Sequence, residues 1–166
     1  MRLTQFSGYG LRVLMYVGLK GEELSTIAEI ANAYGISRNH LMKVVQQLVS
    51  AGFLYSRRGK KGGVRLDGSP DGLRIGTIVK AMEPGFGVAE CMRRGNACAL
   101  TPACRLRAKL LRANQAFLDV LDEVTLAEIL HDDVHQDTLR QLLDIEAPNS
   151  VAIRTRSDSS RPEARN

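Results

Sequence analysis

The cysteines of this chain are the residues whose type and spacing could do chemistry. Cys91, Cys98 and Cys104 fall within fourteen residues, and the sequence has no other cysteine. Their C-x6-C-x5-C spacing differs from the paired C-x2-C of zinc fingers and ribbons, and no histidine lies between them. Thiolates also hold iron–sulfur clusters, and an irregular loop can wrap around one. We therefore expect these residues to ligate a metal centre, with burial as small apolar side chains as the alternative.

The residues around Cys104 support ligation. Thr101 and Pro102 predict a helix start, with threonine as N-cap and proline in the first helical position. Cys104 then falls in the first turn, where free amides and the helix dipole favour a thiolate. Cations crowd the same helix end, against the dipole, and they are Arg105, Arg107, Lys109 and Arg112. Such crowding indicates a nearby anion, either a thiolate-ligated cluster or DNA phosphate.

The helix that begins there carries an apolar seam. The seam residues recur at nearly 3.5-residue spacing, and they are Leu106, Leu110, Ala113, Phe117, Val120 and Val124. This spacing is typical of a helix packed against another helix. We expect residues 102–131 to form a dimerisation helix and a short following helix. The run is shorter than three heptads, so a partner helix within the same chain stays the alternative.

The elements that must position this site begin with a helix-turn-helix over residues 26–50. Thr26 and Glu29 have the spacing of a capping box, and Ser37 is placed to cap the second helix. Apolar residues of that second helix follow helical spacing and leave a polar outer face. The two short helices and their glycine-containing turn predict a DNA-binding unit.

A basic hairpin follows directly, over residues 53–66. Strands are expected at 53–57 and 64–66, with a glycine-rich reversal between them. Five cations lie between Arg57 and Arg65, and such repulsion is tolerable if the hairpin lies along phosphates. We interpret it as a wing, with a mobile basic loop as the alternative. The predicted fold class is mostly α with a small β wing, a winged helix-turn-helix over 1–83 joined by a cysteine loop (84–104) to the long helix.

The charge distribution agrees with this interpretation. Residues 1–66 hold ten lysines and arginines against three acidic residues, a balance of +7. The remaining residues hold thirteen and fifteen (23 − 10 and 18 − 3), a balance of −2. A basic N-terminal half indicates a surface for a polyanion, although a solvated basic surface would look the same.

Other functional classes lack support in the sequence. No catalytic group of serine, histidine and acid, phosphate-binding loop or pair of carboxylates stands out, and the three histidines lie away from the cysteines. We expect no enzyme activity. No apolar run approaches the about 20 residues of a membrane span, and no signal peptide is visible, so a cytoplasmic protein is expected. Residues 132–166 are expected to be a mostly disordered tail.

Several segments resemble the family of winged-helix iron–sulfur regulators that includes the nitric-oxide-sensitive NsrR branch and the IscR-like branch. The likeness runs from residue 1 to about 130. It is carried by Leu3-Thr4-Gln5-Phe6 with Tyr9-Gly10-Leu11-Arg12, Tyr34-Gly35-Ile36-Ser37-Arg38-Asn39-His40, Arg58-Gly59-Lys60-Lys61-Gly62-Gly63-Val64-Arg65-Leu66 and Thr101-Pro102-Ala103-Cys104-Arg105-Leu106. The IscR-like branch has a histidine ligand three residues after its last cysteine, where this chain has Arg107. The NsrR branch is the better match.

The resemblance implies a homodimeric repressor of promoters for nitric-oxide detoxification. Cys91, Cys98 and Cys104 match three thiolate ligands of a cluster, [4Fe–4S] in preference to [2Fe–2S], whose nitrosylation releases the DNA. The family commonly places an aspartate in the first helix as a fourth ligand, donated across the dimer, and here that position is Gly8. Arg12 is retained and could steady an anionic cluster. A sensor of iron–sulfur status, redox state or zinc on the same fold is the alternative.

The DNA contacts follow from the helix-turn-helix geometry, in which the N-terminal end of the second helix enters the major groove. Arg38 and Asn39 are predicted to contact base edges, because arginine suits guanine and asparagine suits adenine. The remaining predicted contacts are to the DNA backbone or minor groove, and they are Ser37, His40, Lys43, Arg57, Arg58, Gly59, Lys60 and Lys61.

Overall fold

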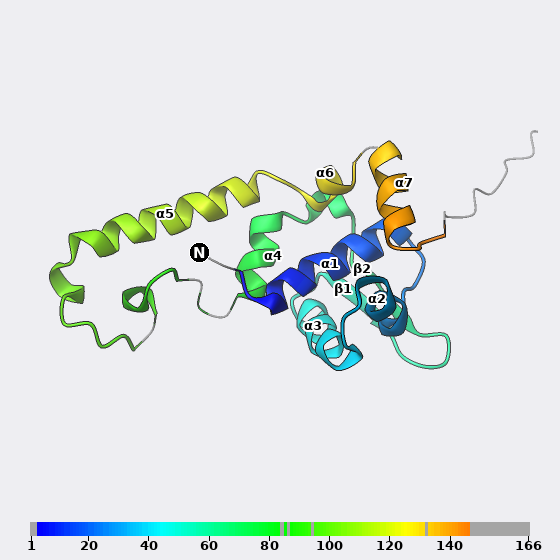
Figure 1. The fold of residues 1–166 in the computed structure, drawn as a ribbon, viewed down its shortest axis with the longest axis horizontal. Coiled ribbons are helices and arrows are strands. Elements are labelled where there is room, and N and C mark those ends of the chain that lie inside the picture. The colour runs from blue at the N-terminus through cyan, green and yellow to red at the C-terminus, as the bar shows by residue number, and fades with distance from the viewer. Residues whose placement is uncertain (1–2, 84, 86, 94, 132, 147–166) are drawn as a thin grey trace, which may run out of the picture.

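The first helix forms the centre of the fold. The computed structural model describes residues 3–83, 85, 87–93, 95–131 and 133–146. Helix α1 (Gln5–Lys20) begins at its N-cap Thr4 and ends at Gly21. Its buried residues include Val13, Leu14 and Val17, each with no exposed surface. Helix α1 packs against α3, α4, α6 and strand β2, as Figure 1 shows, so the core lies around this one helix.

The helix-turn-helix is confirmed, with the caps that the sequence predicts. Helix α2 (Ile27–Tyr34) starts with the capping box of Thr26 and Glu29. Gly35 ends α2 in the left-handed conformation, with φ 62°, which a residue with a side chain rarely adopts. Helix α3 (Arg38–Ser50) is capped by Ser37 and buries Leu41, Val44, Val45 and Leu48.

The wing is a two-stranded antiparallel sheet. Strand β1 (Leu54–Arg57) pairs with β2 (Gly63–Leu66), with Leu54 opposite Leu66 and Arg57 opposite Gly63. An isolated bridge from Ser25 to Val64 also joins β2 to the segment before α2. Strand β2 is therefore paired on both of its edges, by β1 on one and by Ser25 on the other.

Helix α5 (Arg105–Asp122) extends away from the rest of the molecule, as Figure 1 shows. Its C-terminal end packs against α4 (Ile75–Met82), which follows the short 3-10 turn η1 (Pro70–Gly72). The connecting segment between α4 and α5 contains two further 3-10 turns, η2 (Glu90–Met92) and η3 (Thr101–Ala103). None of the described helices is long and apolar enough to cross a membrane.

The predicted start of the long helix was wrong by three residues. Thr101 and Pro102 belong to the 3-10 turn η3, and Cys104 has extended backbone angles, φ −78° and ψ 105°. Because extended angles interrupt helical hydrogen bonding, the α-helix begins at Arg105. Cys104 is its N-cap, without a hydrogen bond from the side chain, and does not lie in the first turn.

Part of the segment that we expected to be a mostly disordered tail, residues 132–166, is ordered. After α6 (Leu126–Leu130), helix α7 (Asp133–Leu142) packs against the end of α1. Ile145 is only 8% exposed, and the Arg140 Nη2 atom donates to the Leu19 carbonyl at 3.2 Å. This burial orders the segment even though polar residues predominate in it. The remainder of the predicted tail, 147–166, lies outside the described residues.

Candidate DNA-binding surface and cysteine site

The N-terminal end of α3 presents its polar side chains to solvent. Ser37 accepts a hydrogen bond from the His40 amide at 3.3 Å and so fixes the first turn. The side chains of Arg38, Asn39 and Lys43 are exposed and make no hydrogen bond or ion pair with other described residues. Helix α3 thus buries one face and leaves the opposite, polar face available to a groove.

The tip of the wing is shaped by glycines and one internal hydrogen bond. Arg57 donates through Nη2 to the Lys61 carbonyl at 2.6 Å, which closes the loop. Gly59 has φ 107°, a conformation that favours glycine, and a Cβ on Gly62 would lie 2.2 Å from the Arg57 carbonyl oxygen. Arg58, Lys60 and Lys61 are exposed around this turn. Of the predicted wing contacts, Arg57 therefore already has a structural partner, whereas these three cations are available.

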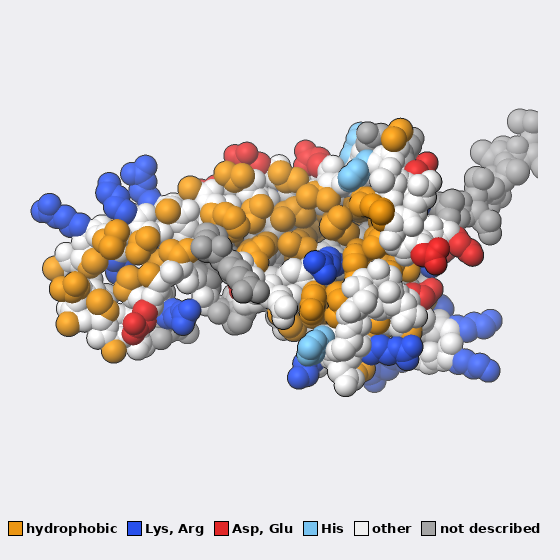
Figure 2. Space-filling model, in the orientation of Figure 1, with side chains coloured by type: hydrophobic (Ala, Val, Ile, Leu, Met, Phe, Trp, Pro, Cys, Tyr) orange, Lys and Arg blue, Asp and Glu red, His pale blue; other side chains and the backbone are white. Residues whose placement is uncertain are grey.

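Arg65, on β2, is the cation of this hairpin that turns away from the tip. Its guanidinium lies 4.9 Å from the centre of the Tyr55 ring and 3.6 Å from a Glu22 carboxylate oxygen. Figure 2 shows lysines and arginines at the wing and, at the other end of the molecule, around the start of α5. These are two separate cationic regions, and the first continues onto the α3 face.

The three cysteines lie in the segment from η2 to the start of α5. Cys91 in η2 and Cys104 are half-buried, Cys98 is exposed, and all three thiols are free. Their chemistry fits a thiophilic metal or an iron–sulfur cluster. Within the described ranges, however, no three side chains of histidine, cysteine, aspartate or glutamate are gathered closely enough to hold a metal ion. The donor types fit, while the loop in this structure does not bring the donors together.

A hydrogen bond joins the cysteine segment to α5, and others lie within the segment. Arg107 donates through Nε to the Cys91 carbonyl at 3.0 Å. Thr101 donates to the Asn96 side chain at 2.7 Å, and its amide donates to the Cys98 carbonyl at 3.1 Å. Arg107 stands where the IscR-like pattern has a histidine, and it holds the backbone carbonyl of Cys91 in place.

Gly8 and Arg12 lie on α1. A Cβ built on Gly8 meets no atom within 4 Å, so the fold leaves room for a side chain there. The Arg12 guanidinium lies 5.9 Å from the ring centres of both Tyr9 and Tyr34. Burial raises the pKa of Tyr34 to about 12, although the charge of Arg12 opposes the shift. The role of Arg12 beside a cluster stays a prediction.

Helix α4 connects the long helix to the recognition helix. On the α5 side, Lys80 Nζ lies 2.6 Å from an Asp122 carboxylate oxygen, and Arg74 donates to the Asp122 carbonyl at 2.7 Å. On the α3 side, Gln47 donates to the Ala81 carbonyl at 3.3 Å. These contacts join residues more than thirty positions apart, and no local pattern in the sequence signals them.

Hydrogen bonds also link the end of α4 to the start of α1. The Thr4 amide donates to the Glu83 carboxylate at 2.7 Å, and the Thr4 hydroxyl donates to the same oxygen at 3.1 Å. Glu83 is the residue that ends α4. The beginning of the cysteine segment is therefore fixed to the helix that carries Gly8.

Comparison with known proteins agrees with this architecture. The family model described as Rrf2, iron-dependent transcriptional regulator, matches residues 3–132. The chain is 41% identical to an HTH-type transcriptional regulator NsrR of Bacillus licheniformis, over 86% of this chain and 99% of that protein. It is 44% identical to the protein of the same name from Geobacillus kaustophilus, over 86% and 97%.

Solved structures give the same result. The chain resembles CymR (YrzC), the global cysteine regulator of B. subtilis, with a TM-score of 0.61 and 27% identity over 78% of this chain and 95% of that one. The match of the family model covers the winged helix, the cysteine segment and α5 together. The chain thus belongs to the Rrf2 family of transcriptional regulators and is a winged-helix regulator, not an enzyme.

Proposed function

We propose that this chain is a cytoplasmic, homodimeric repressor that holds an iron–sulfur cluster and releases promoter DNA when nitric oxide reaches that cluster. The observation that carries the proposal is the likeness to two NsrR regulators at 41% and 44% identity over almost their whole length. The presence of three free cysteines in one segment beside α5 supports the cluster.

For DNA binding, the exposed face of α3 supplies the base contacts. Arg38 and Asn39 suit guanine and adenine edges, and Ser37, His40 and Lys43 lie beside them for phosphate contacts. At the wing, Arg58, Lys60 and Lys61 are available for the backbone or minor groove. Two such units bind half-sites about 34 Å apart, one helical turn or a multiple.

For dimerisation, the long helix supplies an apolar face. Leu118 is buried toward α4, whereas Leu106 is 64% and Val120 60% exposed. In Figure 2 apolar side chains follow α5 along its length. A second copy of α5 would cover this face and place the two recognition helices at a fixed distance from each other.

For sensing, Cys91, Cys98 and Cys104 would hold the cluster, [4Fe–4S] in preference to [2Fe–2S]. When bound, the cluster supplies iron that reacts with nitric oxide. The protein itself must transmit a change in the conformation of the cysteine segment to the recognition helix. Arg107 fixes Cys91 to α5, Asp122 fixes α5 to α4, and Gln47 fixes α3 to α4. A change in how the cysteine segment is held therefore reaches the recognition helix through packed elements.

The test is a nitric oxide titration of protein purified without oxygen. We expect iron and sulfide in the preparation and specific promoter binding that nitric oxide weakens by a factor of about 1,000 or more, the usual ratio of specific to non-specific binding. Cys98→Ser should contain little iron and should not respond, while its helix content stays that of the unmodified chain.

The outcomes separate the proposal from its rivals. Zinc in place of iron and sulfide would support a zinc sensor. A cluster that resists nitric oxide but is lost on iron limitation would support a sensor of iron–sulfur status. Iron-free protein that binds the promoter with the same affinity before and after nitric oxide would contradict sensing altogether, and equal affinity for random and promoter DNA would contradict the repressor.

A further inference from the structure

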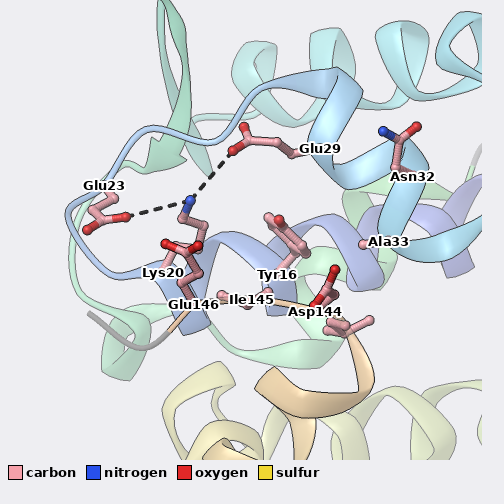
Figure 3. A pocket seen from close by; sticks show the side chains of 10 residues that line it. Tyr16, Lys20, Glu23, Glu29, Asn32, Ala33, Asp144, Ile145 and Glu146 are labelled. Carbon is pink, nitrogen blue, oxygen red and sulfur yellow. Dashed lines mark ion pairs between the residues drawn. The ribbon is translucent and has the colours of Figure 1, made fainter. Parts of the chain in front are cut away.

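A polar pocket lies at the other end of α1, away from the cysteine segment. Its volume is about 530 Å³, and it is formed by α1, α2 and the residues that follow α7. Figure 3 shows its side chains, with Lys20 and Tyr16 from α1 and Glu29 and Asn32 from α2. The chain after α7 closes the opposite wall with Asp144, Ile145 and Glu146.

The charge of the pocket is negative. Among the described residues that line it, four carboxylates (Glu23, Glu29, Asp144 and Glu146) stand against the ammonium of Lys20, a formal charge of −3. Lys20 is shared between Glu23 at 3.6 Å and Glu29 at 3.7 Å. Asp144 and Glu146 have no ion pair with any residue that the structure describes. The pocket therefore has carboxylates in excess of its own cation, and it repels anionic ligands.

Glu29 is ionised at neutral pH. Burial alone would raise its pKa, but hydrogen bonds from Thr26 and the nearby charge of Lys20 outweigh this effect and hold the pKa below its ordinary value. The same carboxylate completes the capping box of α2. Helix α2, the first helix of the helix-turn-helix, thus contributes a negatively charged side chain to the pocket, and the capping box fixes its position.

The hydroxyl group of a mostly buried tyrosine points into this pocket. Tyr16 is only 4% exposed, yet its side chain lines the pocket and its oxygen is directed toward the open space in Figure 3. The ring packs edge-on against Tyr34, but the hydroxyl has no hydrogen-bond partner among the described residues. The oxygen itself is not among the fully buried polar atoms without a partner, so it reaches the open space of the pocket, where a ligand can form a hydrogen bond with it.

We propose that this pocket is a binding site for a small aliphatic amine. Its ammonium groups are held by Asp144, Glu146 and Glu29, and one of them donates a hydrogen bond to the Tyr16 hydroxyl oxygen. A bare metal ion fits less well, because no three of the acidic side chains are gathered closely enough to coordinate one within the described part of the chain. The volume suits a molecule of several heavy atoms, and a linear diamine can meet carboxylates on both walls.

The test uses the full chain without DNA, with 1,4-diaminobutane as the probe and 1,4-butanediol as its neutral counterpart at equal ionic strength. Calorimetric titration should give a dissociation constant of about 1 mM or tighter for the diamine, corresponding to a modest binding free energy, and no binding for the diol. Amide shifts in nuclear magnetic resonance should centre on Asn32, Ala33 and Leu143, which line the pocket.

The variants locate the site. Asp144→Asn combined with Glu146→Gln should weaken diamine binding at least about tenfold, since two charged contacts are lost. Tyr16→Phe keeps the packing and removes one hydroxyl, and we expect it to weaken binding about threefold. The control is Glu22→Gln, which removes one negative charge outside the pocket, from a side chain that is 94% exposed, and should change binding less than about twofold.

Three results would overturn this site. One is equal binding of the diamine and the diol, and another is unchanged affinity in the Asp144 and Glu146 double variant. The third is amide shifts centred on α3 or the wing instead of the pocket. None of these measurements depends on a cluster or on DNA, so the outcome is independent of the proposed sensing function.

Discussion

At the scale of single residues, Gly8 is where this chain departs from the family pattern. The position lies on α1, and open space surrounds the place of a Cβ. An aspartate there would replace the poorest helix former apart from proline and add a negative charge near the positive end of a helix. The resemblance also implies a carboxylate ligand at this position.

We therefore expect Gly8→Asp to raise the free energy of unfolding of the cluster-free protein by about 0.5 kcal/mol, as measured by urea denaturation. In protein that holds a cluster, it should slow cluster loss to a chelator. Gly8→Asn is the matched control, because it adds a side chain of the same size without the charge. Equal rates of cluster loss in the two variants would show that a carboxylate at position 8 is not a ligand.

The individual cations at the tip of the wing also make a testable contribution to DNA binding. Arg58 and Lys60 are exposed and not engaged within the hairpin, unlike Arg57. If they contact phosphates, Arg58→Ala with Lys60→Ala should weaken binding to all DNA sequences and reduce the slope of log affinity against log salt by about one or two. Fluorescence anisotropy at several salt concentrations measures this slope. The control is Arg65→Ala, which removes a cation held by Tyr55 and Glu22; an equal effect of both changes would argue against contact by the tip.

At the scale of elements, Asp122 links α5 to α4. Its hydrogen bond from Lys80, together with the charge of Lys80, holds the pKa of this carboxyl below its ordinary 3.8. Because the folded pKa is lowered, the stabilisation is present above the ordinary value and is lost as the pH falls through the folded pKa.

Asp122→Asn should accordingly be less stable than the unmodified chain at pH 7, and the difference should narrow between about pH 5 and about pH 3. Urea denaturation across this range tests the expectation. Asp119→Asn provides the control, since Asp119 accepts a hydrogen bond from Gln115 of the same helix and is exposed. A stability difference for Asp122→Asn that does not change with pH would exclude its ionised form as the link.

Helix α7 was not predicted from the sequence, and the burial of Ile145, three residues after its end, predicts a clear effect of mutation. Ile145→Ala removes a side chain that is 8% exposed and should lower the free energy of unfolding by about 2 kcal/mol or more. Leu142→Ala, three residues earlier and 75% exposed, should change it by less than about 0.5 kcal/mol. Chemical denaturation of both variants measures the contrast, and similar small effects would mean that residues 133–146 do not pack on the core in solution.

Whether an element could be predicted from the sequence depends on how far apart its interacting residues lie in the chain. The capping box at Thr26, the cap at Ser37 and the glycine-rich wing involve interactions between residues close in sequence, so the sequence alone predicted them. The order in α7 depends on Ile145 meeting the core, and the link at Asp122 depends on Lys80, forty-two positions away. The gathering of Cys91, Cys98 and Cys104 likewise depends on the path of the loop and on what it binds, which spacing does not determine.

At the scale of the whole molecule, helix α5 leaves an apolar face without a partner among the residues that the structure describes. The residues that face α4, Leu118 and Asp122, are used within the chain. Leu106 and Val120 lie on the other side of the helix and are exposed. Such exposure along an extended helix is typical of an interface between subunits, and the proposed repressor needs that interface to space two recognition helices.

Val120→Glu tests this interface directly. In a symmetric dimer the substitution occurs twice, and burial of an unpaired carboxylate should weaken the dimer at least about 100-fold. Sedimentation velocity over a range of concentrations measures the change. Ala108→Glu adds the same charge at an exposed position away from the seam and should leave the dimer unchanged. If both variants sediment as the unmodified chain does, the seam is not the subunit contact, and the spacing of the two recognition helices must be set by another surface.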